Sequence, residues 1–396
     1  MPTLIKPITS CNLKCSYCFQ NDQRDVGNFT DKSQYDLDLI IKSINQLYKE
    51  TKGKQVLHGG EILLLPLNDL ERLLEVIHTN FGKTWLQTNG VLLTTKHVEL
   101  FKKYNTDISI SCDGPNKLNR IRTRVDDKKI DHITKKIMDN IKILCEAGLR
   151  VGVISVISKS HIENDMYTEF QDWILELENI GVKGGRMNLL NSNDKRIIDE
   201  FQLSNDEALD FYIKTAKWLL NNPTLNWCPF REIIDNLLDI GTPNCVYEKC
   251  DPLSTGSVLE ILSEGEVANC SKLATDGIPY LANYDQPISD IRYEQLYQLP
   301  KEDGGCKDCT YWTICHGHCP GEAEEGDWRR KSKFCEVWYG LYDYYYNTLK
   351  AILPNIVLKP DQNFSKKKHE VFNPFSKMQK EIVGNMASSW RCNQNN

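Results

Sequence analysis

The sequence lacks the features that would place the protein in a membrane or on a nucleic acid. Its 396 residues contain no apolar run of about 18 residues, the length that a membrane span needs. The opening stretch "MPTLIKPITS" has no long apolar core of the signal-peptide kind. Acidic and basic residues are mixed, and the formal net charge is only −6. We therefore expect no nucleic-acid partner, no membrane association and a reduced, cytoplasmic setting.

No repeat of the solenoid type is present; the first half of the chain instead alternates strand-like and helix-like segments. Short apolar runs such as "PTLIKPI", "TWLQTNG" and "DISISCDG" are separated by amphipathic segments of helical period. This alternation predicts an α/β fold class, with a partial (β/α)6 TIM barrel over residues 1–215. We expect a helical linker at 216–240, a Cys-rich domain at 241–340, and a C-terminal helix and polar tail at 341–396.

Three cysteines follow the first predicted strand. Cys11, Cys15 and Cys18 have the spacing C-x3-C-x2-C, and the odd total of 15 cysteines argues against a fully paired disulfide framework. A structural zinc ion takes four ligands, so a zinc site here would need a fourth ligand from elsewhere. A [4Fe–4S] cluster also normally takes four thiolates. Three thiolates would leave one iron open to a small molecule, which is where chemistry could occur.

The stretch "CNLKCSYC", including Tyr17 before the third cysteine, resembles the motif of the radical S-adenosylmethionine (SAM) enzymes. The resemblance implies that Cys11, Cys15 and Cys18 are catalytic and hold a [4Fe–4S] cluster. It also implies that SAM chelates the open iron and is cleaved to a 5′-deoxyadenosyl radical, which abstracts hydrogen from a substrate.

The same resemblance assigns further residues to SAM. "HGGE" is similar to the family's GGE motif, although Ile62 stands where relatives commonly have proline. "SISCDGP" and "RIRTRVD" resemble the later segments that contact the cofactor. Arg120 and Arg122 compete with Arg124 for the carboxylate of SAM. The residues assigned to cofactor binding are Tyr17, Gly59, Gly60, Glu61, Ser109, Ser111 and Arg124.

A second field of cysteines occupies the C-terminal third. A zinc ribbon would have two C-x2-C pairs, but only Cys306 and Cys309 form one. The string from Cys250 to Cys335 instead resembles the SPASM domain, which holds two auxiliary [4Fe–4S] clusters in peptide-modifying radical SAM enzymes. The resemblance implies an inner cluster on Cys245, Cys250, Cys270 and Cys319, and an outer one on Cys306, Cys309, Cys315 and Cys335. Without Cys245, the inner cluster would have an open iron.

The resemblance implies a peptide or protein substrate and an electron donor such as flavodoxin or ferredoxin. One candidate reaction is peptide maturation, by a thioether or carbon–carbon crosslink or by epimerisation. The other is anaerobic sulfatase maturation to formylglycine. Sulfatase maturases carry an acid directly after the cysteine that Cys270 matches, whereas this chain has Ser271, a poor base. We therefore favour peptide maturation. A multi-cluster electron carrier is the alternative from another class.

Overall fold

The computed structural model describes residues 2–18, 20, 34–122, 127–240, 245–247, 250, 258–273 and 291–361. Arg124 and residues 362–396 of the predicted tail therefore lie outside the described residues. The chain divides into two compact units. The first contains Met1–Lys183, Asn188–Gln202 and Cys250–Ser289, and the second contains Gly184–Met187, Leu203–Lys249 and Asp290–Asn396. Within the described ranges, no helix is both long enough and apolar enough to span a membrane.

A largely parallel sheet forms the centre of the first unit. Five parallel strands alternate with helices along the chain: β1 (Thr3–Ile5), β2 (Gln55–Leu57), β3 (Thr84–Thr88), β4 (Thr106–Ser111) and β5 (Val151–Ile157). The sequence did not predict the two strands that extend the sheet beyond β1. They are β8 (Leu259–Ile261), which is parallel to β1, and β9 (Val267–Asn269), which is antiparallel to β8.

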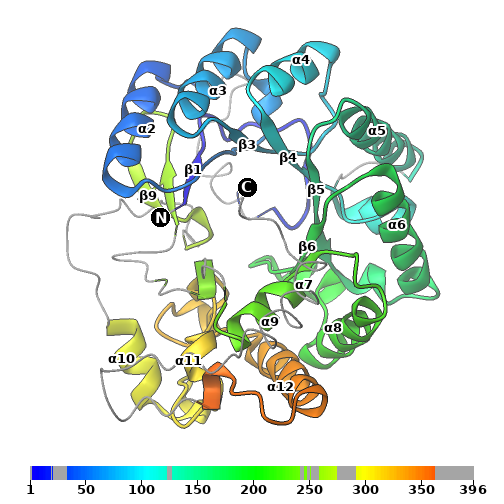
Figure 1. The fold of residues 1–396 in the computed structure, drawn as a ribbon, viewed down its shortest axis with the longest axis vertical. Helices are drawn as coiled ribbons and strands as arrows, with labels where there is room; N and C mark the ends of the chain where they lie inside the picture. Colours follow the sequence, from blue (N-terminus) through cyan, green and yellow to red (C-terminus); the bar gives the residue numbers. More distant parts are fainter. Residues whose placement is uncertain are drawn as a thin grey trace. The chain divides into compact units, whose positions relative to one another are not determined.

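Helices cover one face of this sheet. Figure 1 shows them on the outer side of the strands: α2 (Leu37–Thr51), α3 (Leu67–Phe81), α4 (Thr95–Lys103), α5 (Asp127–Glu146) and α6 (Met166–Ile180). In β4, Ile108 and Ile110 are buried, whereas Ser109 and Ser111 alternate with them and are half-buried. Since successive side chains of a strand point to opposite faces, the serines lie on the face away from the helices. We call this the inner face of the sheet.

The carboxyl ends of parallel strands lie at the same edge of a sheet, so the segments that follow them are brought together. At this edge lie the loop after β1 with the three cysteines, the turn His58–Glu61 after β2, and Cys112–Gly114 after β4. The predicted sixth strand is β6 (Gly185–Leu189), in which Gly185 and Arg186 pair in parallel with β7 (Trp227–Cys228).

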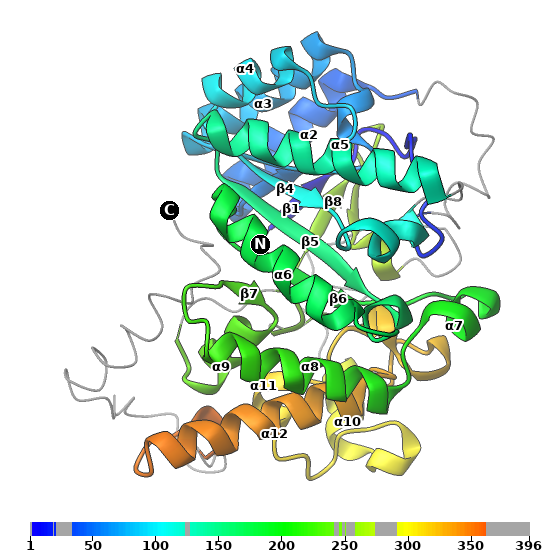
Figure 2. The same cartoon turned by 90° about the vertical axis from the view of Figure 1, so that its right-hand side faces the viewer.

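The second unit is mainly helical. Its helices are α8 (Asn205–Leu220), α9 (Phe230–Leu237), α10 (Ile291–Gln298), α11 (Trp312–Cys315) and α12 (Cys335–Ile352). Figure 2 shows α12, which contains the start of the predicted C-terminal segment, running alongside α8. Gly340 allows this close approach, because a Cβ atom there would lie 2.7 Å from Leu209 Cδ1. The rings of Tyr212 and Trp338 pack edge to face, with their centroids 5.9 Å apart.

The packing of β4 against its helices can be tested by truncating one isoleucine. Ile110 is 0% exposed, so Ile110→Ala should lower the free energy of unfolding by about 2–5 kcal/mol through lost burial and a residual cavity. Ile143 in α5 is 46% exposed, and Ile143→Ala is the matched control with an expected change within about 0.5 kcal/mol. Urea unfolding followed by circular dichroism measures both. Equal losses in the two variants would contradict the assigned burial.

Candidate active site

The three-cysteine loop is held against the turn after β2 by backbone hydrogen bonds. The amide of Gly60 donates to the carbonyl of Ile8 at 2.8 Å, and that of Glu61 donates to the carbonyl of Ser10 at 2.8 Å. A Cβ atom at position 60 would lie only 2.0 Å from the Ser10 oxygen, so this approach requires glycine. The Gly-Gly pair thus positions the segment that leads into Cys11.

The carboxylate of Glu61 connects the same turn to the end of β3. It is 1% exposed, and it accepts hydrogen bonds from the Leu63 amide at 3.0 Å, the Thr88 hydroxyl at 2.5 Å and the Asn89 amide at 2.7 Å. Burial raises the pKa of Glu61 above its usual value. Asn89 in turn donates to Asn12 Oδ1 at 2.8 Å, inside the three-cysteine loop. The structure therefore gives Glu61 a linking role, and its contact with SAM stays a prediction.

A buried cluster of three side chains fixes the other end of the loop. The Tyr17 hydroxyl donates to Asp113 Oδ2 at 2.6 Å, and Arg122 Nη1 donates to the Tyr17 oxygen at 2.8 Å. Arg122 also pairs with Asp113 Oδ1 at 3.3 Å, and the side chains of Arg122 and Asp113 are 7% and 0% exposed. Burial, with the nearby charge of Asp113, holds the pKa of Tyr17 well above its usual value, so its hydroxyl stays protonated.

The three thiols lie between these two anchors. Cys15 is buried, whereas Cys11 and Cys18 are half-buried. Burial raises the pKa of Cys15 to about 12, with the charge of Arg122 opposing the shift. Within the described part of the chain, no three Cys, His, Asp or Glu side chains converge closely enough to bind one metal ion.

Comparison with known proteins identifies this region. The sequence profile of the radical SAM superfamily matches residues 5–174. This range begins in β1, ends in α6, and contains both anchors of the three-cysteine loop. The chain contains a radical SAM domain.

Similarity to characterised radical SAM enzymes extends beyond this domain. The serine-type anaerobic sulfatase-maturating enzyme of Bacteroides thetaiotaomicron is 24% identical over 80% of this chain and 82% of its own length. The cysteine-type enzyme of Clostridium novyi is 28% identical over 86% of this chain and 94% of its own length. The radical SAM cyclopropyl synthase TigE of Paramaledivibacter caminithermalis is 24% identical over 80% of this chain and 66% of its own length.

Solved structures show the same fold. The structure of anSMEcpe with bound AdoMet and the Kp18Cys peptide superposes with a TM-score of 0.66, at 18% identity, over 90% of this chain and 100% of that one. Streptococcus suis SuiB bound to the precursor peptide SuiA gives a TM-score of 0.59, at 18% identity, over 84% of this chain and 75% of that one. The predicted α/β radical SAM fold class is thereby confirmed.

The remaining residues assigned to SAM differ in their positions and in their contacts. Ser109 and Ser111 lie on the inner face, as a cofactor contact there would require. Arg122 forms an ion pair with Asp113 and a hydrogen bond with Tyr17, and Arg120 pairs with Glu163 at 3.3 Å. Arg124 lies outside the described residues. The assignment of the SAM carboxylate to Arg124 therefore stays a prediction.

The four cysteines predicted for the outer auxiliary cluster come together in the second unit. Cys306, Cys309, Cys315 and Cys335 line one cavity, beside Trp312 and other aromatic side chains. Burial raises the pKa of Cys306 to about 12, with the neighbouring Cys335 and Cys309 adding to the shift. Four thiols around one enclosed space match the donor set of a [4Fe–4S] cluster. We infer that this cavity would hold the outer cluster.

Arg292, which belongs to no motif in the sequence, organises the loop that follows Cys315. It is 0% exposed and lies in α10. Its guanidinium donates to the carbonyls of His316 at 3.2 Å, His318 at 3.1 Å and Trp328 at 2.7 Å. It thereby fixes the segment between Cys315 and Cys319. The only sequence signal was one arginine in an amphipathic helix, which ordinarily indicates a solvated side chain.

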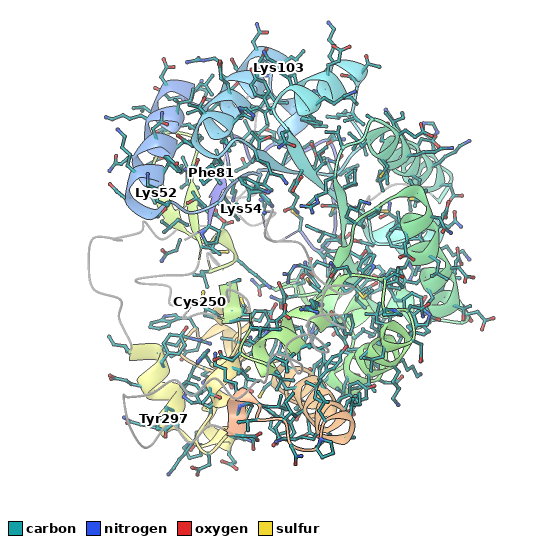
Figure 3. The ribbon with its side chains drawn as sticks, viewed as in Figure 1. Lys52, Lys54, Phe81, Lys103, Cys250 and Tyr297 are labelled. Carbon is teal, nitrogen blue, oxygen red and sulfur yellow. The ribbon has the colours of Figure 1, made fainter. Side chains whose placement is uncertain are left out.

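The predicted inner set is distributed over both units. Cys250, labelled in Figure 3, is buried in the first unit, and Cys270 in the same unit is half-buried. Cys245 is exposed and Cys319 is buried, and both belong to the second unit. Their assignment to one cluster, including the role of Cys245 as the eighth auxiliary ligand, stays a prediction.

The anchor at Asp113 can be tested by removing its charge. Asp113→Asn keeps the size of the side chain but leaves the Arg122 charge buried without a carboxylate. We expect a loss of about 3–5 kcal/mol in the free energy of unfolding, together with weaker iron retention after reconstitution. Asp139→Asn, at an exposed position of α5, is the control and should behave as wild type. Denaturant unfolding and iron analysis measure the effects, and a wild-type result for Asp113→Asn would refute the anchoring role.

The outer cavity makes a separate prediction about metal content. Cys315→Ala and Cys335→Ala should each lower the reconstituted iron content, by up to about four atoms per chain if the whole cluster is lost. Cys145→Ala, at a half-buried position of α5, should leave it unchanged. Iron and acid-labile sulfide analysis decides between these outcomes. Unchanged iron in both cavity variants would show that no cluster binds there.

Proposed function

We propose that the protein is a radical SAM maturase that modifies a residue of a peptide or protein substrate. The observation that carries the proposal is the three-cysteine loop, fixed by buried anchors at the carboxyl edge of a radical SAM domain. When bound, the [4Fe–4S] cluster and SAM supply a 5′-deoxyadenosyl radical that abstracts a hydrogen atom. Cys11, Cys15 and Cys18 would hold the cluster, and Ser109 and Ser111 would face the cofactor from the inner face.

The relatives support a peptide or protein as the substrate. SuiB and anSMEcpe have each been solved with a peptide bound, and both resemble this chain over at least 84% of its length. The electron-carrier alternative gains no support, since a carrier has no need of a radical SAM domain. A one-electron donor such as flavodoxin or ferredoxin would reduce the cluster in the cell.

Two finer reactions remain candidates. Peptide maturation, by a thioether or carbon–carbon crosslink or by epimerisation, is one; the likeness to SuiB, solved with a precursor peptide, and to the cyclopropyl synthase TigE supports a peptide-modifying reaction in general. Formylglycine formation is supported by the sulfatase-maturating relatives, which align over most of their own length. Ser271 does not lack an acid beside it, because Glu260 Oε1 accepts hydrogen bonds from both the amide and the hydroxyl of Ser271 at 2.8 Å, so this residue counts less against formylglycine formation.

The radical chemistry is tested without knowing the substrate. Reconstituted protein incubated with SAM and dithionite should release 5′-deoxyadenosine, measured by liquid chromatography with mass spectrometry. The triple replacement of Cys11, Cys15 and Cys18 by Ala should abolish this product. Cys112→Ala, a buried cysteine outside the motif, is the control and should retain it. Cleavage of SAM by the triple variant would refute the site assignment, and its absence in wild type would refute the proposed function.

A further inference from the structure

A buried network of polar side chains connects β8 with the start of the three-cysteine loop. Glu260 is 1% exposed, and its Oε1 atom accepts two hydrogen bonds from Ser271. Lys6 is 2% exposed, and its ammonium group donates to Ser271 Oγ at 3.0 Å. The same ammonium group lies 3.5 Å from Glu260 Oε2. All three residues belong to the first unit, so the network is complete within it.

The strand register places this network on the inner face. Leu4 of β1 pairs with Val56 of β2 and with Glu260 of β8, so these three side chains point to the same face. Lys6 and His58 come two residues after Leu4 and Val56 and share that face. Both lie at the carboxyl edge, and Cys11 follows Lys6 by five residues. The network therefore faces the side on which the radical would be generated.

The network has unused capacity to accept protons. A serine hydroxyl has one donor and two acceptor positions. Ser271 donates to Glu260 and accepts from Lys6, which leaves one acceptor position for another donor. Among the described residues, Glu260 Oε2 accepts no hydrogen bond, and its one close partner is the Lys6 charge. An unsatisfied buried oxygen is costly, and a hydrogen bond from Ser271 to Glu260 Oε1 gives a proton a direct path to this carboxylate.

His58 borders the network and does not compete for the proton. Burial, with the charge of Lys6, lowers the pKa of His58 to about 4, so its ring is neutral near pH 7. Its Nδ1 atom also lacks a hydrogen-bond partner in the described portion. Lys6 Nζ lies 3.5 Å from Glu260 Oε2, so the ammonium group and the carboxylate form a buried pair of opposite charge.

We propose that Glu260 accepts, through the hydroxyl of Ser271, the proton that leaves a thiol or hydroxyl side chain of the peptide substrate. The inference rests on the proposed function and adds two residues to it. Ser271, which is 2% exposed, would receive the proton at its remaining acceptor position, and Glu260 would act through Ser271. The acid that the sequence did not show after Cys270 is thus supplied by the neighbouring strand.

The step balances as a proton transfer. The S–H or O–H bond of the substrate breaks as a new O–H bond forms at Ser271 Oγ. The original Ser271 O–H bond breaks as one forms at Glu260 Oε1. When bound, SAM and the iron–sulfur clusters would supply the acceptors for the substrate's Cβ hydrogen atom and for the remaining electron. The product then has a carbon–sulfur or carbon–oxygen double bond and has lost two hydrogen atoms.

The test compares product formation with SAM cleavage in the reconstituted holoenzyme. The probes are the Kp18Cys peptide and its counterpart with serine in place of the reacting cysteine. Glu260→Gln keeps an oxygen for Ser271 but cannot accept the proton. It should lower kcat for peptide oxidation by about 10²-fold or more, with a much smaller change in KM. Formation of 5′-deoxyadenosine should remain detectable, so the ratio of deoxyadenosine to oxidised peptide should rise.

Three further variants separate proton transfer from a structural role. Glu266→Gln, at an exposed position of the same hairpin, is the matched control and should oxidise peptide as wild type does. The double variant Lys6→Met with Glu260→Gln removes both buried charges and should stay impaired. Ser271→Asp in the Glu260→Gln background places a carboxylate directly after Cys270 and should restore at least about tenfold of the lost rate.

Each outcome bears on a specific claim. Peptide oxidation at the wild-type rate by Glu260→Gln would overturn the role of Glu260. Recovery in the Lys6→Met double variant would also overturn it, by assigning the loss to an unpaired lysine. Release of 5′-deoxyadenosine by wild type with neither probe oxidised would overturn the inference but not the proposed function. Failure of wild type to release 5′-deoxyadenosine would overturn the proposed function itself.

Discussion

Asp113 has no contact with water and lies against a buried arginine, so its charge must be balanced inside the protein. Taking each ion out of water costs several kcal/mol, and the cost is recovered only where further hydrogen bonds complete the pair. Tyr17 and the amide of Val156 supply those bonds to the two carboxylate oxygens. Because Tyr17 lies between Cys15 and Cys18, the balance of charge at Asp113 also determines where the thiols sit.

The opposite end of the three-cysteine loop is fixed by backbone contact. Gly60 lies so close to Ser10 that any side chain would collide with it, and Glu61 uses both of its oxygens to connect the turn to the end of β3. Charge and close packing thus act on different parts of one loop. Their common effect is to hold three thiols at the edge of the sheet where a cofactor on the inner face could be reached.

In the second unit, a buried charged side chain likewise positions the cysteines of the outer cavity. Arg292 donates to the carbonyls of His316, Gly317 and His318 in the loop between Cys315 and Cys319, which stands in for the regular secondary structure that this segment lacks. A buried cation surrounded by carbonyl oxygens is satisfied without a counter-ion. The thiols of the outer cavity are therefore positioned by a residue that is not itself a ligand.

Spacing along the chain determined the parts of this protein that depend on local order. The alternation of strands and helices and the three-thiol motif could be predicted from the sequence, because hydrophobic period and ligand spacing are local properties. The grouping of Cys306, Cys309, Cys315 and Cys335 was implied by the resemblance to the SPASM domain. The partners of Asp113 and of Ser271 could not be predicted. Arg122 and Glu260 are each close in sequence to the residue they bind, but distant segments complete both clusters: Tyr17 contacts Asp113 and Arg122, and Lys6 contacts Ser271 and Glu260. The tertiary structure alone decided that these two charges are buried, and burial is what gives each of them its role.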